Sequence, residues 1–220
     1  MLPEFKSKLL LETALTHRSA LNEKKSDAKV SNERLEFLGD AVLELSTTKF
    51  LFEKFPDEPE GVLTAYRSSL VKTTTLARIA VKLGLNKMLL MSKGEEATGG
   101  RTNVGILADV TEAVLGAIYI DQGSKAVDEL LGKILFPEIS TIIENKLYKD
   151  SKSFLQEVVQ AKNLETPTYQ VISEIGPDHD KEFTVTVTIG DKVVGRGIGK
   201  SKQQAQQAAA IEALKKFDAS

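Results

Sequence analysis

The chain of 220 residues contains no cysteine and no tryptophan, and it has only two histidines, His17 and His179. Without cysteine it can form neither a disulfide framework nor a thiolate metal site. Two histidines also argue against a histidine-rich zinc site. Any bound metal ion must therefore be held mainly by oxygen ligands.

The sequence also lacks long apolar runs and an excess of positive charge. No stretch approaches the roughly 18 consecutive apolar residues of a membrane span, and residues 1–9 carry charges where a signal peptide needs an apolar core. We therefore expect a cytoplasmic protein without a membrane partner. The formal net charge of −2 argues against binding of nucleic acid through diffuse positive charge. Any contact with nucleic acid must be local.

The hydrophobic pattern changes along the chain. Up to about Tyr148 the apolar residues recur at helical spacing. From Thr168 the pattern is typical of strands: Phe183–Ile189 alternates apolar and hydroxyl residues, and Gly190–Asp191 predicts a hairpin turn. We predict an all-α domain over residues 1–147, a linker over 148–153, and a small α+β domain of order α-β-β-β-α over 154–220.

Two polar segments interrupt the helical pattern of the first domain. They cover residues 22–30 and 92–103, and the second is rich in glycine. Clusters of polar residues and glycine between periodic segments are typical of loops. We predict that both segments are loops.

Acidic residues share helix faces in two segments. Glu33, Glu36 and Asp40 stand at positions i, i+3 and i+7 of one predicted helix. A second predicted helix, residues 105–119, is apolar nearly all round and yet carries Asp109 and Glu112 one turn apart. Burial of that helix would raise the pKa values of both carboxyls unless a cation neutralised them. Magnesium fits this alternative because it prefers hard oxygen ligands and retains bound waters.

Acidic residues on helices usually form a solvated face. We accept that interpretation for Glu44 and Glu53. For Asp109 and Glu112 the apolar surroundings favour a buried metal site, whereas for Glu36 and Asp40 the helical pattern does not decide between the two.

The segment Glu33–Asp40, ERLEFLGD, resembles the signature of the ribonuclease III family almost letter for letter. Further matches extend over Leu15–Ser19, Pro59–Thr64, Gly94–Gly100 and Ile106–Ala113. This resemblance covers essentially the first 145 residues and implies the all-α ribonuclease III endonuclease fold. The unit from Ser151 to Phe217 resembles a double-stranded-RNA-binding domain.

The resemblance implies roles for particular residues of the first domain. The metal-binding carboxylates would be Glu36, Asp40, Asp109 and Glu112, with Asp40 and Glu112 as the catalytic pair. Glu33, Glu60 and Glu96 would lie near the cleavage site or the dimer interface. Phe37 would insert into the partner subunit of a homodimer, although packing of this ring inside its own domain is the alternative. His17 would be a structural histidine and not a ligand.

The same resemblance implies endonucleolytic hydrolysis of double-stranded RNA by a two-metal mechanism. One magnesium ion would activate water and a second would stabilise the leaving 3′ oxygen, with manganese as a possible substitute and no small-molecule cofactor. The products would carry 5′ phosphates and short 3′ overhangs. Ribosomal RNA precursors are the first candidate substrates, followed by other structured RNAs, including messenger and transfer RNAs.

The second domain would contact RNA through three groups of residues. These are Gln156 and Glu157 on the first helix, His179 in the first hairpin loop, and Lys200, Ser201 and Lys202 at the start of the last helix. Gln203 and Gln206 depart from the family pattern, because lysines are common there. From Ser151 onward nine lysines and arginines face nine acidic residues. We therefore expect weaker and more salt-sensitive binding than is typical. The alternative is that Lys200 and Lys202 are ordinary surface lysines.

Two other functions stay open. The first is a catalytically silent double-stranded-RNA-binding protein, since folds are reused without their chemistry; retention of all four carboxylates argues against it. The second is a magnesium-dependent hydrolase of small phosphorylated molecules, which the helices allow but the signature does not favour. Relatives commonly carry a further helical segment before residues 3–6, and its absence here would loosen the packing of the first helix.

Overall fold

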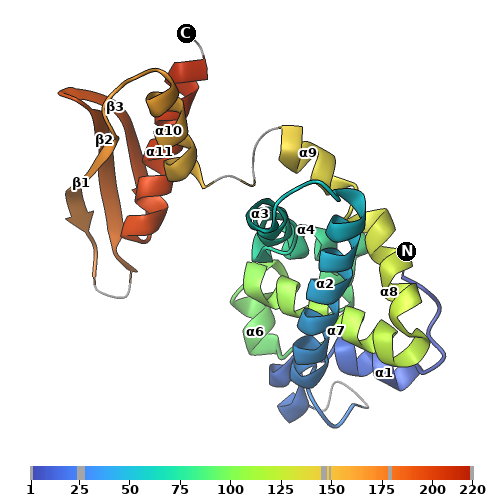
Figure 1. Ribbon diagram of the computed structural model, residues 1–220. Helices are drawn as coiled ribbons and strands as arrows, with labels where there is room; N and C mark the ends of the chain where they lie inside the picture. The colour runs from blue at the N-terminus through green and yellow to red at the C-terminus, as the bar shows by residue number, and fades with distance from the viewer. Residues whose placement is uncertain (1, 24–27, 145–147, 149, 178–179, 219–220) are drawn as a thin grey trace. The chain divides into compact units, whose positions relative to one another are not determined.

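The computed structural model describes residues 2–23, 28–144, 148, 150–177 and 180–218. The chain divides into two compact units, Met1–Tyr148 and Lys149–Ser220. Figure 1 shows that the first is built of helices and that the second combines a sheet with helices. The predicted fold class of each domain is thereby confirmed. Among the described residues, no helix is both long and apolar enough to cross a membrane.

The first unit is arranged around the long helix α7, which is buried on nearly every side. Helices α1, α2 and α4 all pack against α7. The elements of this unit are α1 (Lys8–Ala14), η1 (Arg18–Glu23), α2 (Glu33–Lys54), α3 (Glu60–Leu70), α4 (Thr73–Leu83), α5 (Leu85–Met88), α6 (Lys93–Ala97), η2 (Gly100–Thr102), α7 (Val104–Gln122), α8 (Ser124–Ile134) and α9 (Glu138–Glu144). The apolar sequence of α7 is explained by this central position.

Helices α2 and α7 approach each other backbone to backbone at two glycines. A Cβ atom on Gly39 of α2 would overlap the carbonyl oxygen of Glu112, and one on Gly116 of α7 would overlap the carbonyl oxygen of Leu35. Only glycine fits such a crossing, because every other residue brings a Cβ. The crossing therefore brings Glu36, which precedes Gly39 on α2, close to Glu112, which precedes Gly116 on α7.

The prediction of a loop over residues 92–103 is wrong in part. The segment contains the short helices α6 and η2. Helix α6 begins here because the Ser92 hydroxyl accepts a hydrogen bond from the backbone N–H of Glu95 at 3.0 Å, which satisfies one free donor of its first turn. Gly99, with φ of 91°, then turns the chain into η2. In the other predicted loop, Glu23 ends η1, residues 24–27 lie outside the described residues, and residues 28–30 are not helical.

Residues before α1 are anchored to the end of α7. The backbone N–H groups of Lys6 and Ser7 donate to the carboxylate of Asp121 at 2.8 and 3.0 Å. The side chain of Ser7 also caps α1 by accepting from Leu10. These contacts hold the entry to the first helix.

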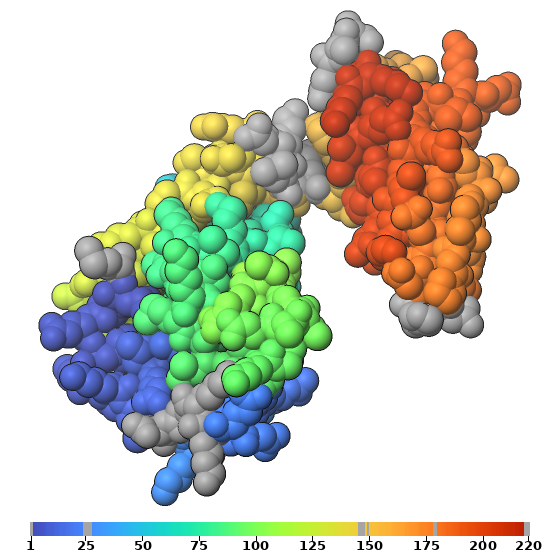
Figure 2. Space-filling view, turned by 180° about the vertical axis from the view of Figure 1, so that it is seen from behind, coloured from blue at the N-terminus to red at the C-terminus, as the bar shows by residue number. Residues whose placement is uncertain are grey.

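The second unit has the predicted α-β-β-β-α order. Its elements are α10 (Ser151–Ala161), β1 (Thr168–Ile175), β2 (Glu182–Ile189), β3 (Lys192–Gly199) and α11 (Lys202–Asp218). The strands form an antiparallel sheet in the order β1-β2-β3. In Figure 2 the red surface of α11 adjoins the orange surface of the strands. Gly195 and Gly197 of β3 allow this contact, because a Cβ on either would overlap the α11 backbone.

Helix α10 begins at Ser151, so residues 151–153 of the predicted linker are helical. The cause is Asp150, whose carboxylate accepts a hydrogen bond from the backbone N–H of Ser153 at 3.0 Å. Aspartate is a favoured N-cap residue, and it places the start of the helix inside the polar segment.

We expect Gly39→Ala to destabilise the first unit by about 3 kcal/mol, because its methyl group would push α2 away from α7. Gly132→Ala in α8 is the matched control: no atom lies within 4 Å of a Cβ there. This control should stabilise the chain by roughly 0.5–1 kcal/mol, since alanine is the better helix former. Chemical denaturation of both variants checks the expectation, and equal effects would contradict it.

Candidate active site

Three carboxylates from α2 and α7 converge beside the glycine crossing. Glu36, Asp109 and Glu112 each offer an oxygen, and these oxygens all lie within 4.8 Å of one another. All three side chains are half-buried. Asp40, which the sequence analysis also assigned to the metal site, stands one turn further along α2, is exposed and does not belong to this trio.

Burial is the largest cause of the unusual acidities in the trio. It raises the pKa of Glu112 to about 7, and the negative charges of neighbouring carboxylates add to the shift. The pKa of Glu36 is raised by burial and then by Asp109 and other acids. The pKa of Asp109 is raised by burial, although His17 and Arg18 act in the opposite direction. Each carboxyl is therefore held where its negative charge is costly, which is the situation that a bound cation relieves.

Two of the three carboxylates, Glu36 and Asp109, line an open polar cleft of about 540 Å³. The residues that line it are His17, Arg18, Asn32, Glu33, Glu36, Glu95, Asn103, Ile106 and Asp109. Acidic groups thus share the cleft with Arg18 and two asparagines. Glu33 contacts Arg18 at 3.7 Å and accepts a hydrogen bond from the Ser31 hydroxyl at 2.7 Å.

Four polar residues of this cleft were not predicted from the sequence: Arg18, Asn32, Glu95 and Asn103. A signal existed for Asn103, because asparagine directly before an apolar helix is typical of an N-cap. Its side-chain oxygen accepts hydrogen bonds from the N–H groups of Gly105 and Ile106 at 2.9 and 3.2 Å. Asn103 therefore both starts α7 and contributes to the cleft wall.

His17 is joined through Ser19 to Ser92, the residue before α6. The Nδ1 atom of His17 lies 2.8 Å from the Ser19 hydroxyl, which in turn accepts the backbone N–H of Ser92 at 3.0 Å. The backbone N–H of His17 donates to the Leu90 carbonyl at 2.9 Å. In Figure 2 the green surface of the middle of the chain adjoins the blue surface of its N-terminal part. These bonds give His17 a structural role at the cleft.

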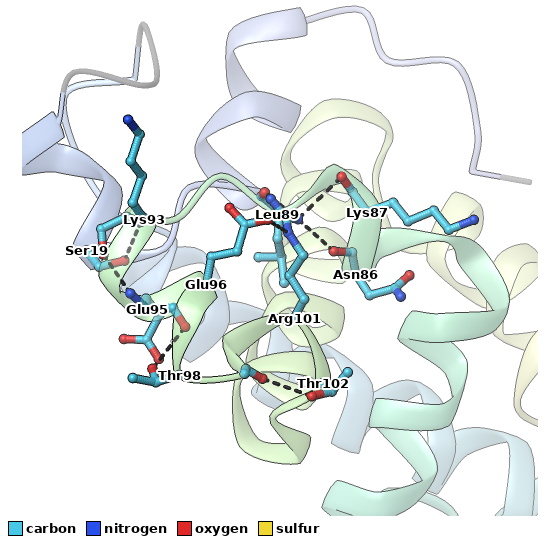
Figure 3. Close-up of polar contacts among 12 residues, drawn as sticks. Ser19, Asn86, Lys87, Leu89, Lys93, Glu95, Glu96, Thr98, Arg101 and Thr102 are labelled. Carbon is cyan, nitrogen blue, oxygen red and sulfur yellow. Dashed lines mark hydrogen bonds and ion pairs between the residues drawn. The ribbon is translucent and has the colours of Figure 1, made fainter.

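Arg101 fixes the segment that carries Glu95 and Asn103. Its Nε donates to the Glu96 carboxylate at 2.6 Å, and one terminal nitrogen donates to the carbonyl oxygens of Asn86 and Leu89 at 2.8 and 3.1 Å. Figure 3 shows the guanidinium group between these partners. Glu96, predicted as an accessory acid, thus forms an ion pair with Arg101, whereas its neighbour Glu95 lines the cleft.

Glu60 does not line the acidic cleft. It begins α3, where it accepts a hydrogen bond from the Thr64 hydroxyl at 3.0 Å. It lines a separate groove of about 430 Å³, with Phe52 and Arg67 among its neighbours. Glu60 therefore lies apart from the three carboxylates, and its predicted role stays a prediction.

Phe37 is 82% exposed, which contradicts the alternative that its ring packs inside its own domain. It borders a mainly apolar depression of about 590 Å³, which Leu10, Leu38 and Ile120 also line. An exposed aromatic ring beside an apolar hollow is a feature that a monomeric surface seldom keeps without a partner.

The residues predicted to contact RNA lie at two places in the second unit. Gln156 and Glu157 are exposed on α10. Ser201 caps α11 by accepting the backbone N–H of Gln204 at 3.2 Å, and Lys200 and Lys202 flank it. His179 lies outside the described residues.

The two unusual glutamines have different surroundings. Gln206 accepts a hydrogen bond from the Lys152 ammonium group at 2.8 Å and so joins α11 to the first turn of α10. Gln203 is exposed beside Gln156 in a polar hollow between the same two helices. One glutamine therefore contributes to packing of the module, and neither adds positive charge.

Comparison with known proteins agrees with this geometry. The sequence model described as Ribonuclease-III-like matches residues 7–139, and the one described as Double-stranded RNA binding motif matches residues 151–217. The chain belongs to the ribonuclease III family. Members of this family cleave double-stranded RNA and need a divalent metal ion, and the chain is an endoribonuclease of this type.

Individual ribonuclease III relatives are similar over nearly the whole chain. It is 48% identical over 214 residues to Ribonuclease 3 of Caldanaerobacter subterraneus subsp. tengcongensis, covering 97% of this chain and 93% of the relative. It is 45% identical over 213 residues to Ribonuclease 3 of Bacillus cereus strain G9842, covering 97% and 86%. A solved nuclease domain of ribonuclease III from Campylobacter jejuni matches with a TM-score of 0.56 and 42% identity, covering 61% of this chain and 92% of that one.

The raised pKa of Glu112 predicts an unusual pH dependence of stability. The folded chain releases the Glu112 proton at about pH 7, whereas an unfolded chain releases it near 4.5. The contribution of this group to the free energy of unfolding is therefore constant below about pH 4.5, where both states bind the proton. It falls as the pH rises to about 7, because only the folded state binds the proton in that window. We expect the metal-free protein to melt at a lower temperature at pH 8 than at pH 5.5.

Thermal melting of Glu112→Gln tests this cause. The variant should lose less stability over the same pH range, and Glu53→Gln, an exposed residue of α2, should behave like the unaltered chain. Addition of magnesium should raise the melting temperature more at pH 8 than at pH 5.5. Identical pH profiles for the unaltered chain and Glu112→Gln would refute the assignment.

Proposed function

We propose that the chain hydrolyses double-stranded RNA with Glu36, Asp40, Asp109 and Glu112 as its metal-binding carboxylates and with Asp40 and Glu112 as the catalytic pair. The observation that carries this proposal is the convergence of three carboxylate oxygens within 4.8 Å, on two helices that cross at glycines. Asp40 joins them through electrostatics, since its charge raises the pKa values of Glu36 and Glu112.

The donor set fits magnesium, with manganese as a substitute, because it consists of hard carboxylate oxygens without sulfur or imidazole. When bound, two such ions would supply an activated water and stabilisation of the leaving 3′ oxygen. Glu112 would lose its proton as the cation enters, since a metal ligand must be ionised. Arg18 and Asn103 line the same cleft and could donate hydrogen bonds to the phosphate group.

The finer features of the activity rest on the family resemblance. They are 5′-phosphate products with short 3′ overhangs, action on ribosomal RNA precursors and other structured RNAs, and a cytoplasmic location. RNA would be held in part by the second unit, through exposed Gln156 and Glu157 and through Lys200, Ser201 and Lys202 at the start of α11.

We also propose a homodimer that covers an apolar stripe on α2. Phe37 and Leu45 stand two helical turns apart and are 82% and 71% exposed, and Phe52, two turns further on, is 71% exposed. Such a stripe on one helix face is typical of an interface. The apolar depression beside Phe37 could accept the same residue of a second copy. The related Campylobacter jejuni structure is described as containing a region involved in dimer formation.

Cleavage of a long labelled RNA duplex with magnesium tests the assigned catalytic residues. We expect Glu112→Gln and Asp40→Asn to lower the cleavage rate by about 100-fold or more while RNA binding persists, because the loss of one ligand disturbs the metal site. Glu53→Gln, on an exposed position of the same helix, should cut normally.

Single-stranded RNA, duplex DNA and nucleotides serve as further substrates. Resistance of the first two would support specificity for duplex RNA, and hydrolysis of nucleotides would favour a small-molecule hydrolase. Binding of duplex RNA without cleavage in magnesium or manganese would make a silent RNA-binding protein the better account.

Phe37→Ala should weaken the dimer at least about tenfold, since buried aromatic anchors dominate interface energies. Sedimentation over a range of protein concentrations measures the change. Val81→Ala, which shortens an equally apolar and 54% exposed residue of α4, should leave the association unchanged. A monomeric unaltered chain at all concentrations would refute the interface.

A further inference from the structure

One of the lysines assigned to RNA is already bound to an acid of its own module. The Lys200 ammonium group lies 2.7 Å from the Asp180 carboxylate. Asp180 precedes β2, whereas Lys200 lies between β3 and α11. The ion pair therefore joins the β1–β2 connection to the start of the last helix, two parts of the module that are both expected to face RNA.

The backbone around Asp180 holds its carboxylate in place. Its N–H donates to the Pro177 carbonyl at 2.9 Å. Gly176 has φ of 106°, and a Cβ there would lie 2.6 Å from the Asp180 carbonyl oxygen. Glycine is therefore favoured at position 176, and the described contacts of Gly176 and Pro177 with Asp180 place its carboxylate beside Lys200.

Nearby acidic residues stabilise the positive charge of Lys200. The pKa of the Lys200 ammonium group is raised chiefly by its hydrogen bond to Asp180, with further attraction from Asp180 and Glu182. Lys202 lies 5.7 Å from the ring centre of Phe183, and Lys181 pairs with Glu174 at 2.8 Å. The cationic groups at this end of the module are accordingly engaged with groups of β1 and β2 or the turn between them.

We propose that Asp180 limits the affinity of the module for RNA. Its carboxylate binds the Lys200 ammonium group as an RNA phosphate would, so that RNA must displace the carboxylate. The pair remains accessible, because the side chains of Lys200 and Asp180 are 60% and 63% exposed. Exposed ion pairs are weak, and a phosphate can therefore exchange for the carboxylate. After the exchange, the released Asp180 charge stays beside the RNA backbone and repels it.

This inference rests on the proposed contact of Lys200 with RNA. The contact with Asp180 would lower the RNA affinity of a module that already has equal numbers of positive and negative residues. The Lys200 charge is present in the free protein but becomes available to RNA only when the contact with Asp180 is broken.

The test is equilibrium binding of the full chain to an RNA duplex at several salt concentrations, with divalent ions chelated to prevent cleavage. Asp180→Asn should bind about two- to fivefold more tightly near 0.15 M salt. The slope of log affinity against log salt should steepen by up to about 1, because one more phosphate is neutralised effectively. Asp191→Asn is the matched control, since it removes the same charge from the exposed β2–β3 turn; it should change affinity less than Asp180→Asn.

Lys200→Gln distinguishes failure of the proposal about Asp180 from failure of the proposed contact between Lys200 and RNA. It should weaken binding, and Asp180→Asn should bring no gain when added to it. If Lys200→Gln weakens binding but Asp180→Asn alone brings no gain, or gains no more than Asp191→Asn, only the inference about Asp180 fails. If Lys200→Gln leaves binding unchanged, the proposed role of Lys200 in holding RNA fails as well.

Discussion

The backbone contact between α2 and α7 is the constraint on which the rest of the first unit depends. Gly39 and Gly116 allow the helices to meet without intervening side chains. The carboxylates next to them are thereby forced together in surroundings that remove much of their hydration. Repulsion among these carboxylates destabilises the crossing. Burial of the apolar residues of α7 on both sides of the acids offsets this repulsion.

Much of this arrangement could be predicted from the sequence. Helical spacing and alternating strand residues gave both fold classes, and the ERLEFLGD segment indicated the family. The pairing of Glu36 with Asp109 and Glu112 was implied by resemblance alone, because spacing along one helix says nothing about which second helix lies opposite. A glycine inside a helix is compatible with a close helix contact, but it does not identify the helix that packs against it.

Other features depended on contacts between distant residues. Glu95 and Glu96 are neighbours with similar chemistry, but Glu96 binds Arg101 whereas Glu95 lines the cleft. The short helices within residues 92–103 were hidden by their glycines, which are typical of loops. Likewise, the attachment of Lys200 to Asp180 joins residues twenty positions apart and leaves no periodic signal.

Helix α2 contributes to three features of the structure. One face meets α7, a second carries the acids, and a third presents the exposed stripe that begins at Phe37. Successive helix residues are about 100° apart around the axis, so the insertion or deletion of one residue would turn everything beyond it away from its neighbour. Length variation should therefore be absent from the stretch between Glu36 and Phe52, while the exposed connection between α10 and β1 can vary in length, since it has no such register to keep.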